Sequence, residues 1–312
     1  MPISNDTMIP PYRQRFQRRP PLTFPFGELI IGLTTTPGPA GWILGVRYMG
    51  EKTKKTDKKP GPISRGCFRV LRKLVELCYP RTRVEGTEHL PDAPCIIVGN
   101  HAQMHGPIAC EFYIPGKHTT WCAGEMTELK EVPSYAFRDF WSGKPRSIRW
   151  LFKIASYLIA PLAVCIFNNA FAIPVYHDTR ILKTFRQTFE ALDGGASVVI
   201  FPEHAEPNNN IVCRFQERFV DVAKLYYKRS GKALRFVPMY VAPKLKTLYL
   251  GPPVVYDPDA GAEAERRRIC DYLSREITRI ARALPEHTVV PYNNVSKKLY
   301  PSNLAFEEAK KI

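Results

Sequence analysis

The sequence predicts an α/β fold in which a mostly parallel sheet is flanked by helices. One observation is that, along residues 64–292, short apolar runs alternate with segments whose apolar residues recur every three or four positions. This alternation is typical of strands joined by crossover helices, which makes the strands parallel. The other is that His101 and Glu203 each follow an apolar, strand-like run. Ligands of parallel sheets gather at the carboxyl ends of strands, so one site can hold both residues.

The length of 312 residues allows one large core and an additional arm. We expect a basic N-terminal arm and linker over 1–63, the α/β domain over 64–292 and a C-terminal tail over 293–312. The arm is rich in proline and includes the charge run EKTKKTDKKPGP. This composition indicates a solvated segment rather than part of the core.

The net charge of +16 predicts an anionic partner. Lipid headgroups, phosphate-bearing ligands and nucleic acid all meet that description. Nucleic acid is not expected, because the chain has no RNP-like stretch and no zinc-finger spacing. The eight cysteines stand singly and no signal peptide opens the chain, which favours free thiols and a cytoplasmic location. The sequence leaves the oligomeric state open.

Periodicity predicts the elements in the first half of the domain. Residues 68–77 fit an amphipathic helix, and the run CIIVGN at 95–100 fits a buried strand. A second helix is predicted over 178–195, with Asp178 as its N-cap and Gly194-Gly195 as its stop. Five apolar residues form its inward face: Ile181, Leu182, Phe185, Phe189 and Leu192.

The second half repeats the pattern. A buried strand over 196–203 precedes a helix that ends at Ser230-Gly231, and strands are predicted over 233–243 and 248–258. The helix is marked by Phe215, Phe219, Val222 and Tyr226. A last helix, 262–284, has an inward face made of Ile269, Leu273, Ile277 and Ile280.

The longest apolar run, 150–167, carries no charge from Ile154 to Phe167 and contains Pro161. Its uncharged part is short for a membrane-spanning helix. It fits either a buried core helix or a helix lying in the membrane interface. The aromatic and basic residues just before it, FRDFWSGKPRSIRW, favour the interface. We therefore expect a cytoplasmic protein that binds peripherally to an anionic membrane surface.

Residues 100–107 read NHAQMHGP, directly after a predicted strand. Pro107 suits the first turn of a helix, so His101 is expected in a strand–loop–helix connection near a helix amino end. Backbone amides there stabilise negative charge, and a neutral imidazole there can accept a proton from a hydroxyl. The alternative is a structural histidine. Asn100 is either a residue that fixes this loop or a simple turn asparagine.

The loop FPEHAEPNN, residues 201–209, follows the strand over 196–203. It can be a polar turn punctuated by Pro202 and Pro207. Alternatively, it forms part of the site, with Glu203 as an orienting or substrate-binding carboxylate.

Four segments between Val84 and Pro253 resemble, in order, the sequence blocks of the lysophospholipid acyltransferase family, which includes the bacterial acylglycerolphosphate acyltransferases. VEGTEHLPDAPCIIVGNH resembles the approach to the family's NHxxxxD block. AIPVYHDTR at 172–180 resembles the second block, VVIFPEHAEP the third (usually FPEGTRS), and FVPMYVAP the fourth. One such block is common by chance, whereas the ordered set is specific.

The resemblance implies O-acyl transfer from a thioester, either acyl-CoA or an acyl-carrier protein, to a hydroxyl of a lysophospholipid or related lipid, without a cofactor or metal. It makes His101 the general base and Glu203 a site carboxylate. Backbone amides would stabilise the oxyanion. Positions for substrate binding then fall on Asn100, His105, His177, Arg180, Phe201, Pro202 and His204.

The chain departs from the family pattern at three points. The motif aspartate, which fixes the imidazole tautomer, is replaced by Gly106. The block-two arginine falls on His177, and the third block reads Ala205-Glu206-Pro207 in place of threonine-arginine-serine, so a phosphate there would meet a like charge. Other groups that could take over the aspartate's role are Glu111, Asp178 and Glu203, or His105 through a hydrogen bond.

Two alternatives stay open on the sequence. The chain could keep the fold as a lipid-binding or scaffold protein that has lost the base–acid pair. It could also hold a metal, although HAQMH lacks the glutamate of HExxH and Pro107 argues against a helix through the pair. The ligands of that metal would be His101, His105, Glu203, His204 and Glu206.

Overall fold

The computed structural model describes residues 61–305 apart from 142–143, 177 and 294. These residues all belong to one compact unit, Lys59–Ile312. The arm and linker expected over 1–63 lie almost wholly outside the described residues, and so does His177.

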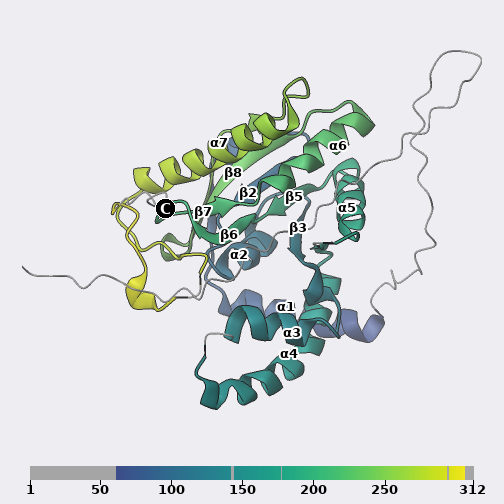
Figure 1. The fold of residues 1–312 in the computed structure, drawn as a ribbon, viewed down its shortest axis with the longest axis vertical. Helices are drawn as coiled ribbons and strands as arrows, with labels where there is room; N and C mark the ends of the chain where they lie inside the picture. Colours follow the sequence, from purple (N-terminus) through teal and green to yellow (C-terminus); the bar gives the residue numbers. More distant parts are fainter. Residues whose placement is uncertain (1–60, 142–143, 177, 294, 306–312) are drawn as a thin grey trace, which may run out of the picture. The chain divides into compact units, whose positions relative to one another are not determined.

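A sheet of eight strands forms the centre of this unit, in the order β1-β9-β8-β2-β5-β3-β4, with β10 paired to β8. β8 is antiparallel to β9 and β10, and every other pairing in this sheet is parallel. The predicted mostly parallel α/β fold is confirmed (Figure 1). The strands are β1 (Arg83–Glu85), β2 (Ile96–Gly99), β3 (His118–Ala123), β4 (Ile173–Val175), β5 (Ser197–Ile200), β8 (Arg235–Ala242), β9 (Thr247–Leu250) and β10 (Val254–Val255).

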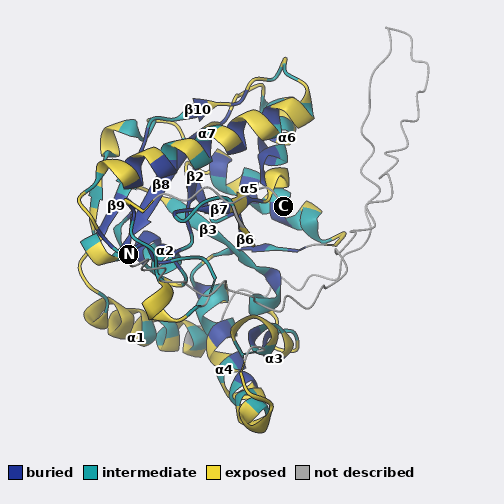
Figure 2. Ribbon diagram, turned by 60° about the vertical axis from the view of Figure 1, so that its left-hand side comes forward, coloured by how far each residue is buried: buried dark blue, intermediate teal, exposed yellow. Residues whose placement is uncertain are grey.

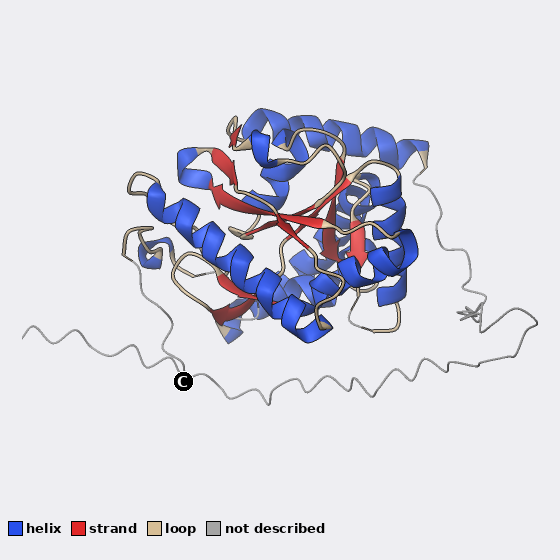
Figure 3. Ribbon diagram, turned by 90° about the horizontal axis from the view of Figure 1, so that it is seen from above, coloured by secondary structure: helices blue, strands red, loops and turns tan. Residues whose placement is uncertain are grey.

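Helices lie on both sides of the sheet, as Figure 3 shows. Gly231, in the left-handed conformation with φ 68°, ends one of them at the predicted Ser230-Gly231. The helices are α1 (Pro62–Cys78), α2 (His105–Tyr113), α3 (Val132–Ala136), α4 (Arg149–Asn169), α5 (Ile181–Asp193), α6 (Asp221–Ser230) and α7 (Ala262–Ala283). A separate antiparallel hairpin consists of β6 (Glu203–Pro207) and β7 (Cys213–Phe215).

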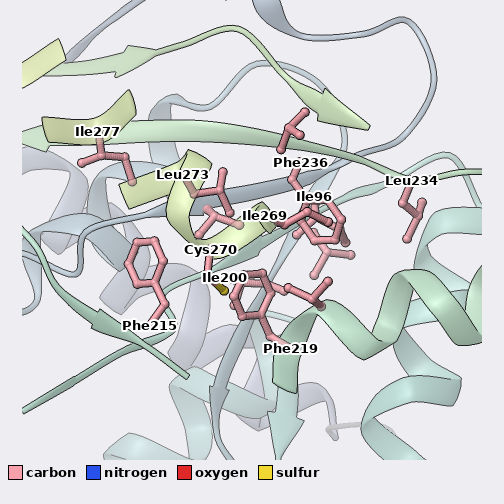
Figure 4. Close-up of a cluster of buried hydrophobic side chains, with 14 of the residues drawn as sticks. Ile96, Ile200, Phe215, Phe219, Leu234, Phe236, Ile269, Cys270, Leu273 and Ile277 are labelled. Atoms are coloured by element: carbon pink, nitrogen blue, oxygen red, sulfur yellow. The ribbon is translucent and has the colours of Figure 1, made fainter. Parts of the chain in front are cut away.

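The core forms two layers because successive residues of a strand face opposite sides of the sheet. On one side, Ile96 and Phe236 pack with Ile269, Leu273 and Ile277 of α7 (Figure 4), which confirms the predicted inward face of that helix. On the other side, the intervening strand residues, which include Ile97, Val237 and Met239, pack against Ala109 and Cys110 of α2. The central strands are thus fixed from both faces, and so are the points where they end.

Several sequence predictions are wrong in detail. Phe215 lies on β7 instead of a helix, because alternation along Cys213-Arg214-Phe215 buries the first and third residues. Leu182 of α5 is 60% exposed and does not face the core. The segment 248–258 contains two strands, β9 and β10, because both pair with β8. β3 was not predicted at all, since its sequence HTTWCA has no buried apolar run.

The fold continues past residue 292, where the tail was expected. Asn303 is fully buried, and its side-chain amide donates to the carbonyl oxygen of Ala281 at 2.8 Å. Its side-chain oxygen accepts the backbone N–H of His287, also at 2.8 Å. One asparagine thereby ties the chain after residue 295 to the end of α7.

α1 and α4 pack against each other, and Figure 2 colours most of both helices as exposed or intermediate, in yellow and teal. Many of their exposed residues are apolar. Within the described residues, one stretch, Arg146–Asn169, has the length and hydropathy of a membrane-crossing helix, and only 17% of its apolar window is buried. In α1, the apolar residues Leu74 and Leu77 are exposed. The large exposed residues of α4 are Trp150, Leu151, Ile154, Tyr157, Leu158 and Leu162.

Candidate functional site around His101

The site begins where two neighbouring strands end. β2 and β5 are parallel and in register, with Val98 opposite Ile200. Because parallel strands end at the same edge of a sheet, His101 after β2 meets Phe201 and Glu203 after β5. About a hundred residues of sequence separate these groups, and the strand pairing brings them together.

Glu203 joins two loops through its carboxylate. One oxygen accepts the backbone N–H of His101 at 2.5 Å, and the other accepts the backbone N–H of Cys213 at 2.8 Å. The side chain is buried, and burial raises its pKa to about 7 even though both N–H groups act in the opposite direction. Glu203 therefore binds the main chain of His101 and fixes the position of its loop.

The imidazole of His101 takes its orientation from the main chain. Its Nδ1 is hydrogen-bonded to the carbonyl oxygen of Gln103. A carbonyl oxygen can only accept, so Nδ1 carries the proton and Nε2 has a free lone pair. Burial lowers the pKa of His101 below its ordinary value, which keeps the ring neutral at pH 7. A neutral ring with a free Nε2 is the form a general base requires.

The backbone at Ala102 and Gln103 is unusual. Both residues are left-handed, with φ 44° and 56°, a conformation rarely adopted by residues other than glycine. This turn aims the Gln103 carbonyl back at the imidazole. The amides of His105 and Gly106 donate to the carbonyl oxygens of Ala102 and His101, both at 3.1 Å. We expected backbone amides near the start of the helix to stabilise an oxyanion. For the amides of His105 and Gly106 this expectation is wrong, because both already donate hydrogen bonds inside the loop.

Gly106, at the position of the family aspartate, has no room for a side chain. A Cβ at this position would lie 2.7 Å from the carbonyl oxygen of His101 and 2.8 Å from the ring of Phe201. Relieving the first contact requires movement of the backbone that carries the histidine. In this protein the contact to Nδ1 comes from the Gln103 carbonyl oxygen.

Aromatic side chains surround the imidazole. The Phe201 ring lies 5.2 Å from it and the Tyr292 ring 5.8 Å, the latter edge-on. Burial raises the pKa of Tyr292, and the charges of Asp139 and Glu203 raise it further. Sequence analysis missed Tyr292 because it lies in an aperiodic segment after the last helix.

Two other predicted residues hold the edge of the sheet. The buried Asn100 donates from its side-chain amide to the carbonyl oxygen of Val241 at 3.2 Å and accepts the N–H of Val241 at 2.7 Å. It thereby extends the pairing of β2 with β8 by one residue. Pro202 is buried, and its carbonyl accepts the N–H of Gln216 at 2.8 Å.

His105 and Arg180 lie away from the imidazole. His105 Nδ1 is 3.3 Å from the hydroxyl of Tyr79, and its ring lines a cavity of about 30 Å³ on the α2 side of β8. Arg180 follows β4, which β5 and β3 separate from β2. Its guanidinium is paired with the three carboxylates of Asp178, Glu128 and Glu131, at 2.9 to 3.3 Å. An anionic substrate would compete with these carboxylates for Arg180.

The hairpin β6–β7 supplies a basic group that sequence analysis missed. Glu206, where the family has arginine, is paired with Arg214 at 3.4 Å. His204 accepts the N–H of Glu206 at 3.3 Å through Nδ1, so it also belongs to this hairpin. The negative charge of Glu206, which was expected to repel a phosphate, therefore has the positive charge of Arg214 beside it. Only the strand register of a hairpin could have paired these residues.

The metal alternative finds no support in the described part of the chain. There, no three histidine, cysteine or acidic side chains lie close enough together to share a metal ion. The His101 nitrogen Nδ1 and both Glu203 oxygens are instead occupied by main-chain groups.

We expect the stability of the protein to fall as the pH rises from about 5 to 8 through Glu203. Its pKa of about 7 lies above the value of 4.5 for an exposed glutamate, so the folded state keeps its proton to higher pH than the unfolded state. The unfolding free energy contributed by this group therefore decreases with pH, by a total on the order of 3 kcal/mol. Urea unfolding of the wild type and Glu203→Gln across this range tests the sign. Parallel curves for the two proteins would contradict it.

Comparisons with known proteins give a likeness to solved structures. No family model matches the chain, and no curated protein matches it. A solved structure that matches is the 1-acyl-sn-glycerophosphate (LPA) acyltransferase PlsC from Thermotoga maritima, with 16% sequence identity and a TM-score of 0.39. The match covers 70% of this chain and 80% of that one.

Proposed function

We propose that this protein is an O-acyltransferase that moves a fatty acyl group from a thioester to a hydroxyl of a lysophospholipid or related lipid. The observation that carries the proposal is the neutral imidazole of His101, with Nδ1 bonded to the Gln103 carbonyl and Nε2 free. The ordered sequence blocks between Val84 and Pro253 support the same reaction class.

The proposed reaction uses His101 twice. Nε2 accepts the proton of the acceptor hydroxyl as its oxygen attacks the thioester carbonyl carbon. The tetrahedral intermediate collapses, the carbon–sulfur bond breaks, and the thiolate leaves with the proton from the imidazolium. The products are an ester and a free thiol. The donor is acyl-CoA or an acyl-carrier protein, and the proposed step does not require a cofactor.

The test is acyl transfer by the purified full-length chain. Palmitoyl-CoA is incubated with lysophosphatidic acid, lysophosphatidylcholine or monoacylglycerol, and both free thiol and new ester are measured. The expected result is equal amounts of thiol and ester with at least one acceptor. Thiol without ester would indicate a hydrolase. Absence of both, with palmitoyl-acyl-carrier protein also inactive, would reject the proposal.

One observation favours a second candidate, a lipid-binding protein without catalysis. The amides of His105 and Gly106 are used inside the loop, and Pro107 has none, so these positions offer an oxyanion no donor. Palmitoyl-CoA that binds and is recovered intact in the assay above would support this candidate.

We also propose that the protein acts at the cytoplasmic face of an anionic membrane, with α1 and α4 against the lipid. Their exposed apolar residues lie beside basic side chains, which suit acidic headgroups. The exposed basic residues of the two helices are Arg65, Arg69, Arg72, Lys73 and Lys153, and Arg146 is exposed in the turn just before α4.

Leu158→Glu is expected to weaken binding to anionic vesicles about tenfold, because it removes an apolar side chain, 75% exposed in the protein, from the lipid and adds a negative charge. Co-sedimentation with phosphatidylglycerol vesicles measures the effect, and phosphatidylcholine vesicles should bind less protein. Leu182→Glu is the matched control, since Leu182 is also exposed but lies on α5. Equal loss in both variants would refute a specific role for α4.

A further inference from the structure

The loop that orients His101 is held by a side chain from the far end of the described chain. The amide nitrogen of Gln103 donates to the hydroxyl oxygen of Tyr300 at 2.8 Å. Gln103 is the same residue whose carbonyl bonds Nδ1 of His101. Its side chain and its carbonyl are therefore fixed by two different partners.

The position of Tyr300 is itself fixed on both sides. Its ring packs against the core layer on the α2 side of the sheet. The carbonyl oxygen of the next residue, Pro301, accepts the N–H of Val289 at 2.9 Å. The backbone N–H of Asn303 donates to the carbonyl oxygen of His287 at 3.1 Å. The hydroxyl of Tyr300 is thus presented to Gln103 by a segment anchored in the fold.

We propose that Tyr300 is a positioning residue for His101. By holding the side chain of Gln103, it keeps the left-handed turn at Ala102 and Gln103 and so keeps the Gln103 carbonyl on Nδ1. Left-handed residues other than glycine persist only where their surroundings hold them. Without the hydroxyl, the turn relaxes, the carbonyl moves off the imidazole, and the proton is shared between Nδ1 and Nε2.

Tyr300→Phe tests this inference, because it removes the hydroxyl and keeps the ring. Nitrogen-15 spectra of histidine-labelled full-length protein report the tautomer directly, with the His101 signals identified by their loss in His101→Asn. The wild type should show a protonated Nδ1 and a bare Nε2, and Tyr300→Phe a mixture. Tyr272→Phe is the matched control, since it also removes one hydroxyl bond, to the Pro252 carbonyl at 2.9 Å, but on α7.

The effect on turnover rests on the proposed function, whereas the tautomer does not. With palmitoyl-CoA and its best acceptor, kcat should fall about fivefold in Tyr300→Phe with KM unchanged, matching one neutral hydrogen bond of about 1 kcal/mol. If the wild type has no transferase activity, the proposed function fails, and the nitrogen spectra still decide the inference.

A second variant guards against an indirect effect of Tyr300→Phe. Gln103→Met removes the same hydrogen bond from its other side. If both residues act through that bond, the double variant should match either single variant in tautomer mixture and kcat. Additive losses, or wild-type nitrogen shifts in Tyr300→Phe, would overturn the proposal.

Discussion

Replacing His101 by asparagine is expected to lower the kcat for acyl transfer by about 10²–10⁴-fold, the usual contribution of a general base. The side-chain amide of asparagine can still donate to the Gln103 carbonyl in place of Nδ1, but it offers no basic nitrogen at the position of Nε2. The loop should therefore stay folded while the chemistry is lost. The measurement is ester formation under saturating palmitoyl-CoA and acceptor.

His118→Asn is the matched control for this variant. Nδ1 of His118 is also bonded to a backbone carbonyl, that of Gly116 at 3.0 Å. However, His118 is the first residue of β3, so it lies at the amino ends of the parallel strands, whereas His101 lies at their carboxyl ends. Both variants should unfold within about 4 °C of the wild type, the shift expected for about 1 kcal/mol in a chain of this size. Activity retained in His101→Asn would show that His101 is not the base.

Placing an aspartate five residues after His101, by Gly106→Asp, is expected to lower both stability and activity. Its Cβ would lie 2.7 Å from the carbonyl oxygen of His101, which cannot retreat without breaking its bond to the Gly106 N–H. Overpacking of this kind costs about 1–3 kcal/mol. The displaced backbone carries the imidazole, so acyl transfer should fall as well. Urea unfolding and the acyl-transfer assay measure the two losses.

Two variants separate the clash from the charge. Gly106→Ala adds the Cβ alone and should reproduce most of the stability loss. Gly261→Asp makes the same change at the N-cap of α7, where a Cβ meets nothing within 4 Å, and should leave the protein as stable or more stable. Higher activity in Gly106→Asp would show that a carboxylate orients His101 better than the Gln103 carbonyl does.

The sheet and the meeting of its loops follow from sequence patterns. Buried strands such as 95–100 and 196–203 are visible as apolar runs, and parallel pairing puts their carboxyl ends together, so His101 and Glu203 can be expected at one edge. The sequence does not predict which group of His101 contacts the Glu203 carboxylate, because the imidazole and the backbone N–H can both donate to it.

The orientation of His101 was not predictable from residue types. Ala102 and Gln103 are neither glycine nor asparagine, so nothing in the sequence marks a left-handed turn there. Tyr292 and Tyr300 lie in an aperiodic stretch that resembles a tail, and only tertiary packing brings them to the loop. Local patterns found the elements, whereas these contacts depend on segments nearly two hundred residues away.

The peptide carbonyl at position 103 has a consequence for recognising related proteins. Every amino acid carries that group, so no codon change at this position can delete it, whereas one base substitution can remove a motif aspartate. Sequence searches that demand an acid five places after the histidine would discard any homologue built in this way. A genome screen for such proteins should select on the geometry of the turn after the histidine and not on the presence of an aspartate.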